Sequence, residues 1–406
     1  MPTSTDPPTA ADPPTPTDPL LAPLLELIEH ELPRAVALRH RLHSHPELAH
    51  AERWTTAAVA EELPVESQTV AETGRCARVG PDTGAVIAVR AELDALPIKE
   101  HTGSEFSASG EVMHACGHDV HMAALVALVR AAHALADQLP AALLALYQPS
   151  EEAYPSGAQQ LADGALAELA PAAVVGAHIH PELPWRAVAL DAGVVNASCD
   201  AIEITVEGRP SHGAYPHLGR DPILALAQIV VALHIQVAAR SDPLAPAVLT
   251  VGVIEGGSAE NVIPARASAR GALRAYSAEH RRELRELVEQ VSQGIAQAHG
   301  CSAEVRLVAG EPPLENDGAI VARARELLPA AGFALGKPWR SCGSDDFAFF
   351  GALAPLAMAF VGLDGAPGFT TRPLHHPELL PPDDAVGAVA RAQAALYLAA
   401  AGTARL

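Results

Sequence analysis

The ten residues 113–122, MHACGHDVHM, hold three histidines, one cysteine and one aspartate immediately before an apolar run. The start of a helix accounts for one aspartate in its first turn, but not for three imidazoles and a thiol. Imidazole and thiolate groups are ligands of transition metal ions. Cys116 and His118 flank Gly117, and a tight turn at this glycine would direct both side chains toward one ion. The stretch therefore predicts a metal site.

Four further segments are rich in ligand-type residues: RAELDALP (90–97), QPSEEAYPSGA (148–158), GAHIHP (176–181) and PLHHPEL (373–379). An isolated histidine is more often a satisfied core residue, and a glutamate pair is usually a solvated helix end. Here each segment follows an expected strand or lies in a loop of one α/β pattern. That convergence favours a shared site.

The pair Glu151–Glu152 offers two carboxylates with different directions. One would bind metal while the other accepts a proton from the attacking water. His178 and His375 complete the ligand set from distant loops. A thiolate among imidazoles and carboxylates favours zinc, cobalt, nickel or manganese and disfavours magnesium or calcium. These residues predict a hydrolase with two divalent transition metal ions.

The elements that position these residues follow an alternating pattern. Buried strands are expected over 84–92, 141–148 and 172–180, and helices over 119–139 and 156–169. This is the βαβ pattern of an α/β fold with a mainly parallel sheet, in which ligands bind at the carboxyl ends of the strands.

The middle of the chain changes character. Strands are expected over 199–208, 247–257 and 267–276, and helices over 221–240 and 277–300. This order predicts a smaller α+β domain at 195–308, inserted into a catalytic domain made of residues 21–194 and 309–406. Residues 1–20 are rich in Pro, Thr and Asp, which predicts a disordered tail.

Composition excludes several classes of protein. The formal net charge of −21 argues against binding to nucleic acid or to an anionic membrane. No apolar run is expected to reach the length that spans a bilayer. The N-terminus lacks the basic start and apolar centre of a signal peptide, and five scattered cysteines predict no disulfide framework. A cytoplasmic enzyme is therefore expected.

The order of the motifs LHSHPEL, MHACGHDVH, QPSEEA, SHGAYPH, ENVIPA and LHHPEL carries a resemblance. Over about residues 35–400 the chain resembles the aminoacylase and carboxypeptidase-like family of dinuclear metallopeptidases with an inserted dimerisation lid. It is similar to the branch that contains hippurate hydrolases and plant auxin–amino acid conjugate hydrolases.

The resemblance implies a role for each matching residue. It implies that Glu151 is the general acid/base and that Asp94 lies behind a metal ligand and orients it. It implies that two metal ions are bound by Cys116, His118, Glu152, His178 and His375.

In the inserted domain, the resemblance implies that His212 stabilises the tetrahedral oxyanion. Asn261 and Arg274 would contact the substrate, and the guanidinium of Arg274 suits a carboxylate. The family also implies a homodimer formed through residues 195–308, in which His212 reaches the partner subunit's metal centre.

The chain departs from the family pattern at two positions. Glu92 stands where the family usually has Asp, and Asp345 stands where it usually has Glu. Both changes keep the charge and move it by one methylene, which leaves metal preference and pocket shape open. In GAHIHP the motif match favours His178 over His180, and in LHHP it favours His375 over His376.

Three functions fit these observations. The leading hypothesis is metal-dependent hydrolysis of the amide bond of an N-acyl amino acid. The alternative is a dipeptidase or carboxypeptidase with the same dinuclear site. The third is an inactive metal-binding or peptide-binding protein, against which the intact Glu151–Glu152 pair argues.

Overall fold

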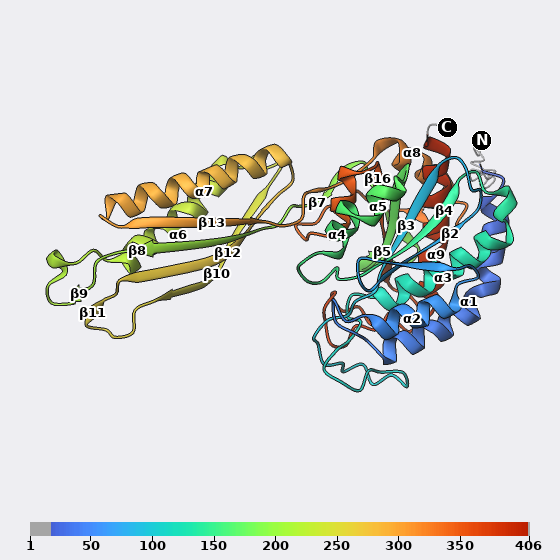
Figure 1. Ribbon diagram of the computed structural model, residues 1–406, viewed down its shortest axis with the longest axis horizontal. Coiled ribbons are helices and arrows are strands. Elements are labelled where there is room, and N and C mark those ends of the chain that lie inside the picture. Colours follow the sequence, from blue (N-terminus) through green and yellow to red (C-terminus); the bar gives the residue numbers. More distant parts are fainter. Residues whose placement is uncertain (1–17, 405–406) are drawn as a thin grey trace, which may run out of the picture. The chain divides into compact units, whose positions relative to one another are not determined.

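The computed structural model describes residues 18–404 and divides into two compact units (Figure 1). Unit 1 comprises the described residues up to Asp191, together with Asp317–Pro338 and those from Leu353 on. Unit 2 comprises Ala192–Asn316 and Trp339–Ala352.

The sequence-based domain boundaries differ from these units in three segments. Residues 192–194, 309–316 and 339–352, expected in the catalytic domain, lie in unit 2. The reason is pairing within unit 2: Leu314–Asn316 pairs with Gly193–Asn196, and Ser341 forms a bridge with Asn196. Of the expected disordered tail, residues 1–17 lie outside the described residues.

Unit 1 is built from helices and one large sheet. Its helices are α1 Leu21–Ser44, α2 Arg53–Glu62, α3 His118–Ala134, η1 Ala136–Gln138, α4 Gly157–Asp163, α5 Ala165–Leu169, α8 Gly318–Leu327 and α9 Asp384–Thr403. Its strands are β1 Ser67–Val70, β2 Gly74–Val79, β3 Val86–Glu92, β4 Ala142–Gln148, β5 Ala173–Pro184, β6 Ala187–Ala189, β15 Ala334–Leu335 and β16 Leu356–Asp364. The single helix expected over 156–169 is two helices, which meet at Gly164.

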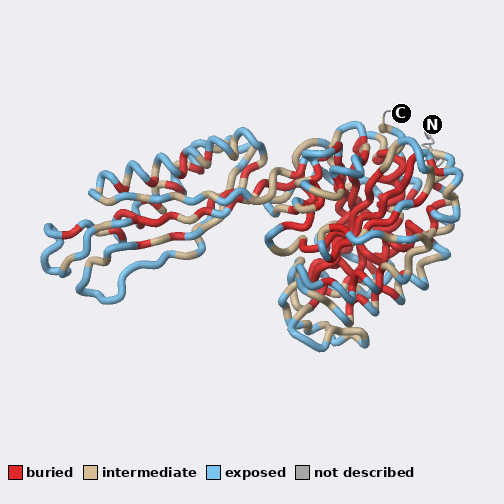
Figure 2. The backbone as a smooth tube through the Cα atoms, viewed as in Figure 1, coloured by how far each residue is buried: buried red, intermediate tan, exposed pale blue. Residues whose placement is uncertain are grey.

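The sheet of unit 1 has the strand order β1-β2-β4-β3-β5-β16-β6-β15. The four central strands, β4, β3, β5 and β16, are parallel, whereas the pairs β1–β2, β2–β4 and β16–β6 are antiparallel and the edge pair β6–β15 is parallel. The α/β prediction is confirmed, with the parallel character confined mainly to the centre. The central strands are buried along almost their whole length, as strands with both faces covered must be (Figure 2).

Helices α1, α3 and α9 pack together beside this sheet (Figure 1). Helix α3 is buried on nearly all sides because it lies against both other helices and the strands. Its Asp119 accepts hydrogen bonds from Arg39 Nε and His43 Nδ1 of α1, both at 3.0 Å. Arg39 also donates to Asp383 and to the carbonyl of Pro381, just before α9. The buried Arg39 thus connects the N-terminal, central and C-terminal parts of unit 1 through ion pairs and a hydrogen bond.

Unit 2 contains a four-stranded antiparallel sheet of order β10-β12-β8-β13. The strands of unit 2 are β7 Gly193–Asn196, β8 Asp200–Glu207, β9 Ser211–His212, β10 Ala247–Gly256, β11 Val262–Ile263, β12 Arg266–Ala275, β13 Ser302–Ala309 and β14 Leu314–Asn316. Its helices are η2 Pro216–Leu218, α6 Pro222–Arg240, α7 Ala278–Ala298 and η3 Asp346–Ala352. The core lies between the sheet and the helices α6 and α7.

Within residues 18–404, two helices are long and apolar enough to cross a membrane, α6 and α9. The expectation that no apolar run reaches this length was therefore wrong. Helix α9 is a core helix of unit 1, with 78% of its apolar 18-residue stretch buried. Helix α6 has 33% of its stretch buried, and Ile229, Leu233 and Val237 contribute to the core of unit 2. By themselves, these features are weak evidence for a membrane segment.

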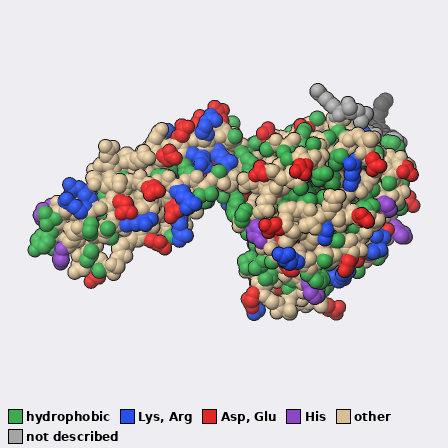
Figure 3. Space-filling model, viewed as in Figure 1, with side chains coloured by type: hydrophobic (Ala, Val, Ile, Leu, Met, Phe, Trp, Pro, Cys, Tyr) green, Lys and Arg blue, Asp and Glu red, His purple; other side chains and the backbone are tan. Residues whose placement is uncertain are grey.

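The surface mixes both signs of charge. On the face drawn in Figure 3, Asp and Glu side chains are interspersed with Lys and Arg side chains. On this face, the acidic side chains that contribute to the formal charge of −21 are therefore not separated from the basic ones.

Candidate metal centre

The carboxyl ends of β3 and β4 and the middle of β5 bring expected ligands to one level of the sheet in unit 1. Glu92 pairs with Gln148, which places the Glu151–Glu152 turn just beyond the level of Glu92. Arg90 pairs with Gly176, so that His178 is level with Glu92. Because these strands are parallel, the three segments meet where β3 and β4 end, while β5 continues to Pro184.

The turn Cys116–Gly117–His118 depends on its glycine. Gly117 has a φ of +82° and lies at the N-cap of α3, and a Cβ there would stand 2.2 Å from Ile179 Cδ1. Both the backbone conformation and the close approach of β5 thus require glycine. The turn holds Cys116 and His118 near the strand ends, and both side chains are buried.

The potential ligand atoms form overlapping groups in unit 1. Within each group, one ligand atom from every residue lies within 4.8 Å of the others. The groups are Cys116 with Glu152 and His375, His118 with Glu151 and Glu152, and Glu92 with His118, His121 and His178. Cys116 and His118 fall in different groups, contrary to the expectation that Gly117 turns both toward one ion.

Short distances separate the ligand atoms, both within one group and between two groups. Cys116 Sγ lies 3.5 Å from His178 Nε2, and His375 Nε2 lies 3.2 Å from Glu152 Oε1. His118 Nε2 lies 3.9 Å from Glu151 Oε2. The structure therefore brings all five expected ligands together with Glu151.

Several buried atoms of the cluster lack a hydrogen-bond partner among the described residues. They are His118 Nε2, Glu152 Oε1 and Asp94 Oδ1. The opposite ring nitrogen of His118 is bonded, since Nδ1 donates to the backbone carbonyl of Asp94 at 2.8 Å. That bond leaves Nε2 unprotonated in the neutral ring and aimed into the cluster. A buried imidazole lone pair beside carboxylates fits a metal ion.

The electrostatics of the cluster point the same way. Burial, with the nearby carboxylates of Glu152 and Glu151, raises the pKa of the Cys116 thiol well above its ordinary value. Burial alone would lower the pKa of His118, but Glu92 and Asp94 raise it to about 10. An excess of negative charge therefore surrounds this thiol and imidazole, and a divalent cation would favour their metal-binding forms.

Asp94 contacts two of the expected functional residues. Its Oδ2 accepts a hydrogen bond from the backbone N–H of Glu152 at 2.9 Å, and its Oδ1 lies 3.6 Å from His118 Nδ1. Burial alone would raise the pKa of Asp94, but His118 and the backbone N–H groups of Glu152 and Glu151 hold this pKa below its ordinary value. The carboxylate thus spans the His118 side chain and the glutamate turn.

Sequence reasoning assigned no role to His121, and both of its ring nitrogens are engaged. Nδ1 donates to Glu92 Oε2 at 2.8 Å, and Nε2 accepts from the backbone N–H of Ile179 at 3.0 Å. The bonds use both nitrogens, so His121 supports the strand that carries His178. The signal was its position three residues after His118, which places both on one helix face.

The alternative histidines lie differently. The side chain of His180 belongs to none of the ligand groups found among the described residues. His376 Nδ1 accepts a hydrogen bond from the backbone N–H of Glu378 at 3.1 Å. His114 is buried outside these groups, and burial lowers its pKa to about 4. The placement favours His178 and His375, as the motif match did.

The remaining expected residues lie in unit 2. His212 and Asn261 are neighbours, because His212 pairs with Val262 and the N–H of Gly213 donates to the carbonyl of Asn261 at 2.7 Å. Both are exposed. Arg274 Nη1 donates to the carbonyl of Cys342 at 2.9 Å.

Asp345 has a local structural contact. Its Oδ1 accepts a hydrogen bond from the N–H of Phe347 at 2.9 Å, at the start of η3. An aspartate is suited to such a short-range cap.

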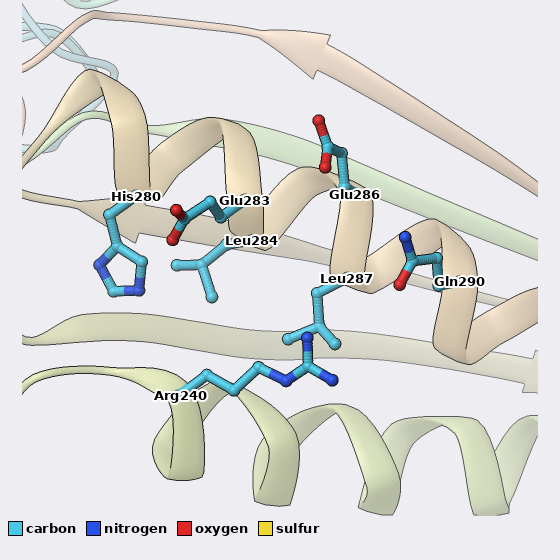
Figure 4. Close-up of a pocket in the computed structure, with 7 residues that line it drawn as sticks. All are labelled: Arg240, His280, Glu283, Leu284, Glu286, Leu287 and Gln290. Carbon is cyan, nitrogen blue, oxygen red and sulfur yellow. The ribbon is translucent and has the colours of Figure 1, made fainter.

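A hollow of about 190 Å³ lies elsewhere in unit 2, between α6 and α7 (Figure 4). Arg240 reaches from α6 toward Leu287, and α7 supplies the remaining lining residues, His280, Glu283, Leu284, Glu286 and Gln290. None of the expected metal or substrate residues lines it, so the hollow is separate from the chemistry described above.

Comparisons with known proteins identify the family of this chain. The model of peptidase family M20/M25/M40 matches residues 88–397. The chain belongs to this family. It is 36% identical over 348 residues to N-acetyl-L-cysteine deacetylase of Bacillus subtilis strain 168, covering 84% of this chain and 82% of that protein.

Two further relatives extend the comparison. The chain is 34% identical to N-acyl-L-amino acid amidohydrolase of Geobacillus stearothermophilus over 296 residues, covering 71% of this chain and 80% of that protein. The structure of the Bacillus subtilis YxeP protein, described as a dinuclear metal binding peptidase from the M20 family, superposes with a TM-score of 0.80 at 29% identity. That match covers 91% of this chain and 98% of the other.

The cluster predicts a measurable role for Cys116. We expect Cys116→Ala to hold fewer metal equivalents after dialysis than the wild type, because the variant loses a buried thiolate ligand. Chelator-treated wild type should be inactive and should recover with a divalent transition metal. Elemental analysis and activity measurements check both statements.

The matched control is Cys76→Ala, which removes another buried thiol from β2, outside the cluster. It should lose stability at most and keep its metal content. Full activity of metal-free wild type would contradict the prediction, and so would an unchanged metal content of Cys116→Ala.

Proposed function

We propose that this family member hydrolyses the amide bond of an N-acyl amino acid and releases a carboxylic acid and an amino acid. The observation that carries the proposal is the position of Glu151 in one ligand group with His118 and Glu152, with its Oε2 3.9 Å from His118 Nε2. Relatives named as N-acetyl-L-cysteine deacetylase and N-acyl-L-amino acid amidohydrolase support this substrate class.

Two divalent transition metal ions would be held by Cys116, His118, Glu152, His178 and His375. Cys116 would be among the ligands, since its Sγ is grouped with Glu152 and His375 and lies 3.5 Å from His178 Nε2. When bound, the ions would lower the pKa of water and polarise the amide carbonyl. The thiolate favours zinc, manganese, cobalt or nickel.

Glu151 would accept the proton from the attacking water and return it to the leaving nitrogen. A general acid/base must lie within reach of the reacting atoms without being consumed as a ligand. Glu152 directs its carboxylate to His375, at 3.2 Å, which leaves the proton transfer to its neighbour. Asp94 would hold His118 and the glutamate turn in register.

His212 would donate a hydrogen bond to the oxyanion. Its Nδ1 accepts from the N–H of Ala214 at 3.0 Å, which puts the proton of the neutral ring on Nε2. Nε2 is then a donor, as stabilisation of developing negative charge requires. Asn261, beside it, would contact the substrate, and Arg274 would bind the substrate carboxylate.

Within unit 2, His212 and Arg274 lie at opposite ends of the sheet. Arg274 adjoins the pair Leu273–Asp200, while His212 follows the other end, where Arg266 pairs with Glu207. The stretch between these pairs spans roughly 23 Å at about 3.3 Å per residue. One amino acid derivative cannot reach both residues of a single unit 2. If both act on one substrate, they come from two subunits.

We therefore propose a homodimer formed through unit 2, with His212 acting at the partner's metal centre. An exposed apolar face of α6 supports it, since Ile223, Leu224, Val231 and Ile235 are 42–60% exposed. Strand β10, which contacts α6, is an edge of the four-stranded sheet. An apolar helix face next to an open strand edge is suited to a second copy of the same element. If unit 2 covers a metal centre as a lid, it does so as part of this proposed homodimer.

The alternative is a dipeptidase or carboxypeptidase with the same metal site, and a third function is binding without catalysis. The substrate class separates them: N-acetyl and N-benzoyl amino acids for the first, dipeptides for the second, and turnover of neither for the third. The cytoplasmic location expected from the sequence stays a prediction.

For Glu151→Gln, we expect the fold and the metal content to be kept while kcat on N-acyl amino acids falls at least about 10²–10⁴-fold. The amide keeps the shape of the carboxylate but cannot accept the proton. Glu152→Gln is the contrasting variant and should lose metal. Near-normal turnover of Glu151→Gln, or a defect explained by metal loss, would show that the assignment is wrong.

For Arg274→Ala, we expect a sharply lower kcat/KM for N-acyl amino acids with a free carboxylate. The wild type should prefer the free acid to its C-terminal amide, because only the acid pairs with the guanidinium. Arg270→Ala, on the same strand, is the matched control and should behave as wild type. Equal wild-type rates on acid and amide would contradict a carboxylate role for Arg274.

The dimer predicts complementation between two inactive variants. In a mixed dimer of His212→Ala and Glu151→Gln, one site carries both changes and the other carries neither, so activity should return after subunit exchange. A mixture of Cys116→Ala and Glu151→Gln should stay inactive, because each site keeps one lesion. Native mass spectrometry verifies exchange. Exchange without regained activity, or a fully active monomer, would refute the trans arrangement.

A further inference from the structure

The segment 45–52, HPELAHAE, overlaps the motif LHSHPEL, to which the proposed mechanism assigns no role. It lies in unit 1 against two of the strand ends that carry the metal cluster. The carbonyl of Glu47 accepts a hydrogen bond from the N–H of Ala95 at 2.8 Å, directly after Asp94. At its other end, Glu52 contacts Ser150, directly before Glu151.

Ser150 has an unusual backbone conformation. Its φ is +52°, in the left-handed region that residues other than glycine rarely adopt. This conformation turns the chain from Pro149, after β4, into the Glu151–Glu152 pair. A serine persists here only if its surroundings hold it.

Every polar group of Ser150 is bonded. Its N–H donates to Glu52 Oε1 at 2.8 Å, and its carbonyl accepts from the N–H of Gly157 at 3.0 Å. Its hydroxyl lies 3.3 Å from Glu52 Oε1 and accepts from the N–H of His50 at 2.9 Å. Ser150 is 1% exposed. The residue before the catalytic pair is therefore anchored on three sides.

Glu52 is the centre of this anchor. It is 0% exposed, and its second oxygen accepts a hydrogen bond from Thr73 Oγ1 at 2.7 Å. The carboxylate is thus held by neutral donors from two loops. A buried carboxylate directed at one backbone N–H fixes that peptide unit more firmly than a neutral acceptor does.

We propose that Glu52 is a positioning residue. Its carboxylate stabilises the left-handed conformation of Ser150 and so aims Glu152 at the metal ligands and Glu151 at the substrate. The proposal rests on the proposed function for the role of Glu151, but its effect on metal binding does not depend on which substrate is cleaved. Groups that orient a ligand commonly contribute about 10–100-fold to metal affinity or activity.

The experiment measures the affinity for Zn²⁺ by competition with a chromophoric chelator, together with kcat and KM. Glu52→Met keeps the volume and removes the acceptor. We expect its affinity for Zn²⁺ to fall about 10–100-fold and kcat to fall while KM changes little. Glu52→Gln should keep most of the affinity, because the amide oxygen still accepts from the N–H of Ser150.

The matched control is Glu47→Met, a change in the same segment. Glu47 Oε2 accepts from the N–H of Thr55 at 2.7 Å near the start of α2 and is not bonded to Ser150. This variant should lose thermal stability in the metal-free form and keep wild-type affinity for Zn²⁺. Comparing Glu47→Met with Glu52→Met therefore distinguishes a residue that only stabilises the fold from one that orients Glu151 and Glu152.

Position 150 supplies the rescue. Glycine adopts positive φ without strain, so Ser150→Gly should restore affinity for Zn²⁺ in the Glu52→Met background. Ser150→Thr keeps the N–H and the hydroxyl but resists positive φ, so it should lower affinity alone. If Glu52→Met fails to fold, Ser150→Thr tests the conformation of residue 150 without it, and wild-type affinity for Zn²⁺ in Ser150→Thr then overturns the proposal.

Wild-type affinity in both Glu52→Met and Ser150→Thr would overturn the proposal. So would a loss in Glu52→Met that Ser150→Gly does not restore, because Glu52 would then support only the fold. If the affinities follow the expected pattern but no amide substrate is hydrolysed by the wild type, the proposed function fails and the positioning role stands.

Discussion

The structure of unit 1 depends on one electrostatic constraint: carboxylates, a thiol and imidazoles share a buried space where unpaired charge is costly. Glu152 Oε1, Asp94 Oδ1 and His118 Nε2 are buried without hydrogen-bond partners among the described residues. Burying such groups is unfavourable unless a counter-charge or a ligand satisfies them. A divalent cation meets this requirement, because it attracts the carboxylates and favours the thiolate of Cys116. The same buried carboxylates, thiol and imidazoles therefore make the arrangement unfavourable without a cation and suit it to bind one.

The surrounding fold holds these groups in place although they repel one another. Three parallel strands deliver the residues to one edge, and Gly117 allows α3 to begin directly against β5. Behind this edge, hydrogen bonds restrain the ligands. Asp94 accepts from His118 through its backbone carbonyl and from the N–H of Glu152 through its carboxylate, and His121 is bonded to Glu92 and to β5. The network of Arg39, His43 and Asp119 fastens the first turn of α3 to α1. Rigid supports of this kind are what a metal site requires for accurate geometry.

Much of this arrangement followed from local patterns. The strands ending at Glu92 and Gln148 and the helix ending at Arg240 were predicted within two residues of their observed limits, because buried runs and end signals are short-range features. The pairs Asp221–Pro222 and Ser277–Ala278 mark helix starts in both sequence and structure. The motif order predicted Cys116, His118, Glu152, His178 and His375 as ligands, and the structure brings these side chains close together. Longer-range features were less accurate: residues 339–352 belong with unit 2 because they pair with β7, and no local pattern reports such pairing.

The sequence by itself determined which residue types can do the chemistry and that they follow consecutive strand ends, since ligand chemistry and hydrophobic period are written locally. It did not distinguish a ligand from its support. His118 and His121 are both histidines of the first turn of α3, yet only the first keeps a ring nitrogen without a hydrogen-bond partner, because Glu92 and Ile179 engage the second. Glu52 and Ser150 are 98 residues apart and meet only after folding. Such contacts join distant segments through packing, and so the tertiary structure alone decided which side chains face the site and which hold them there.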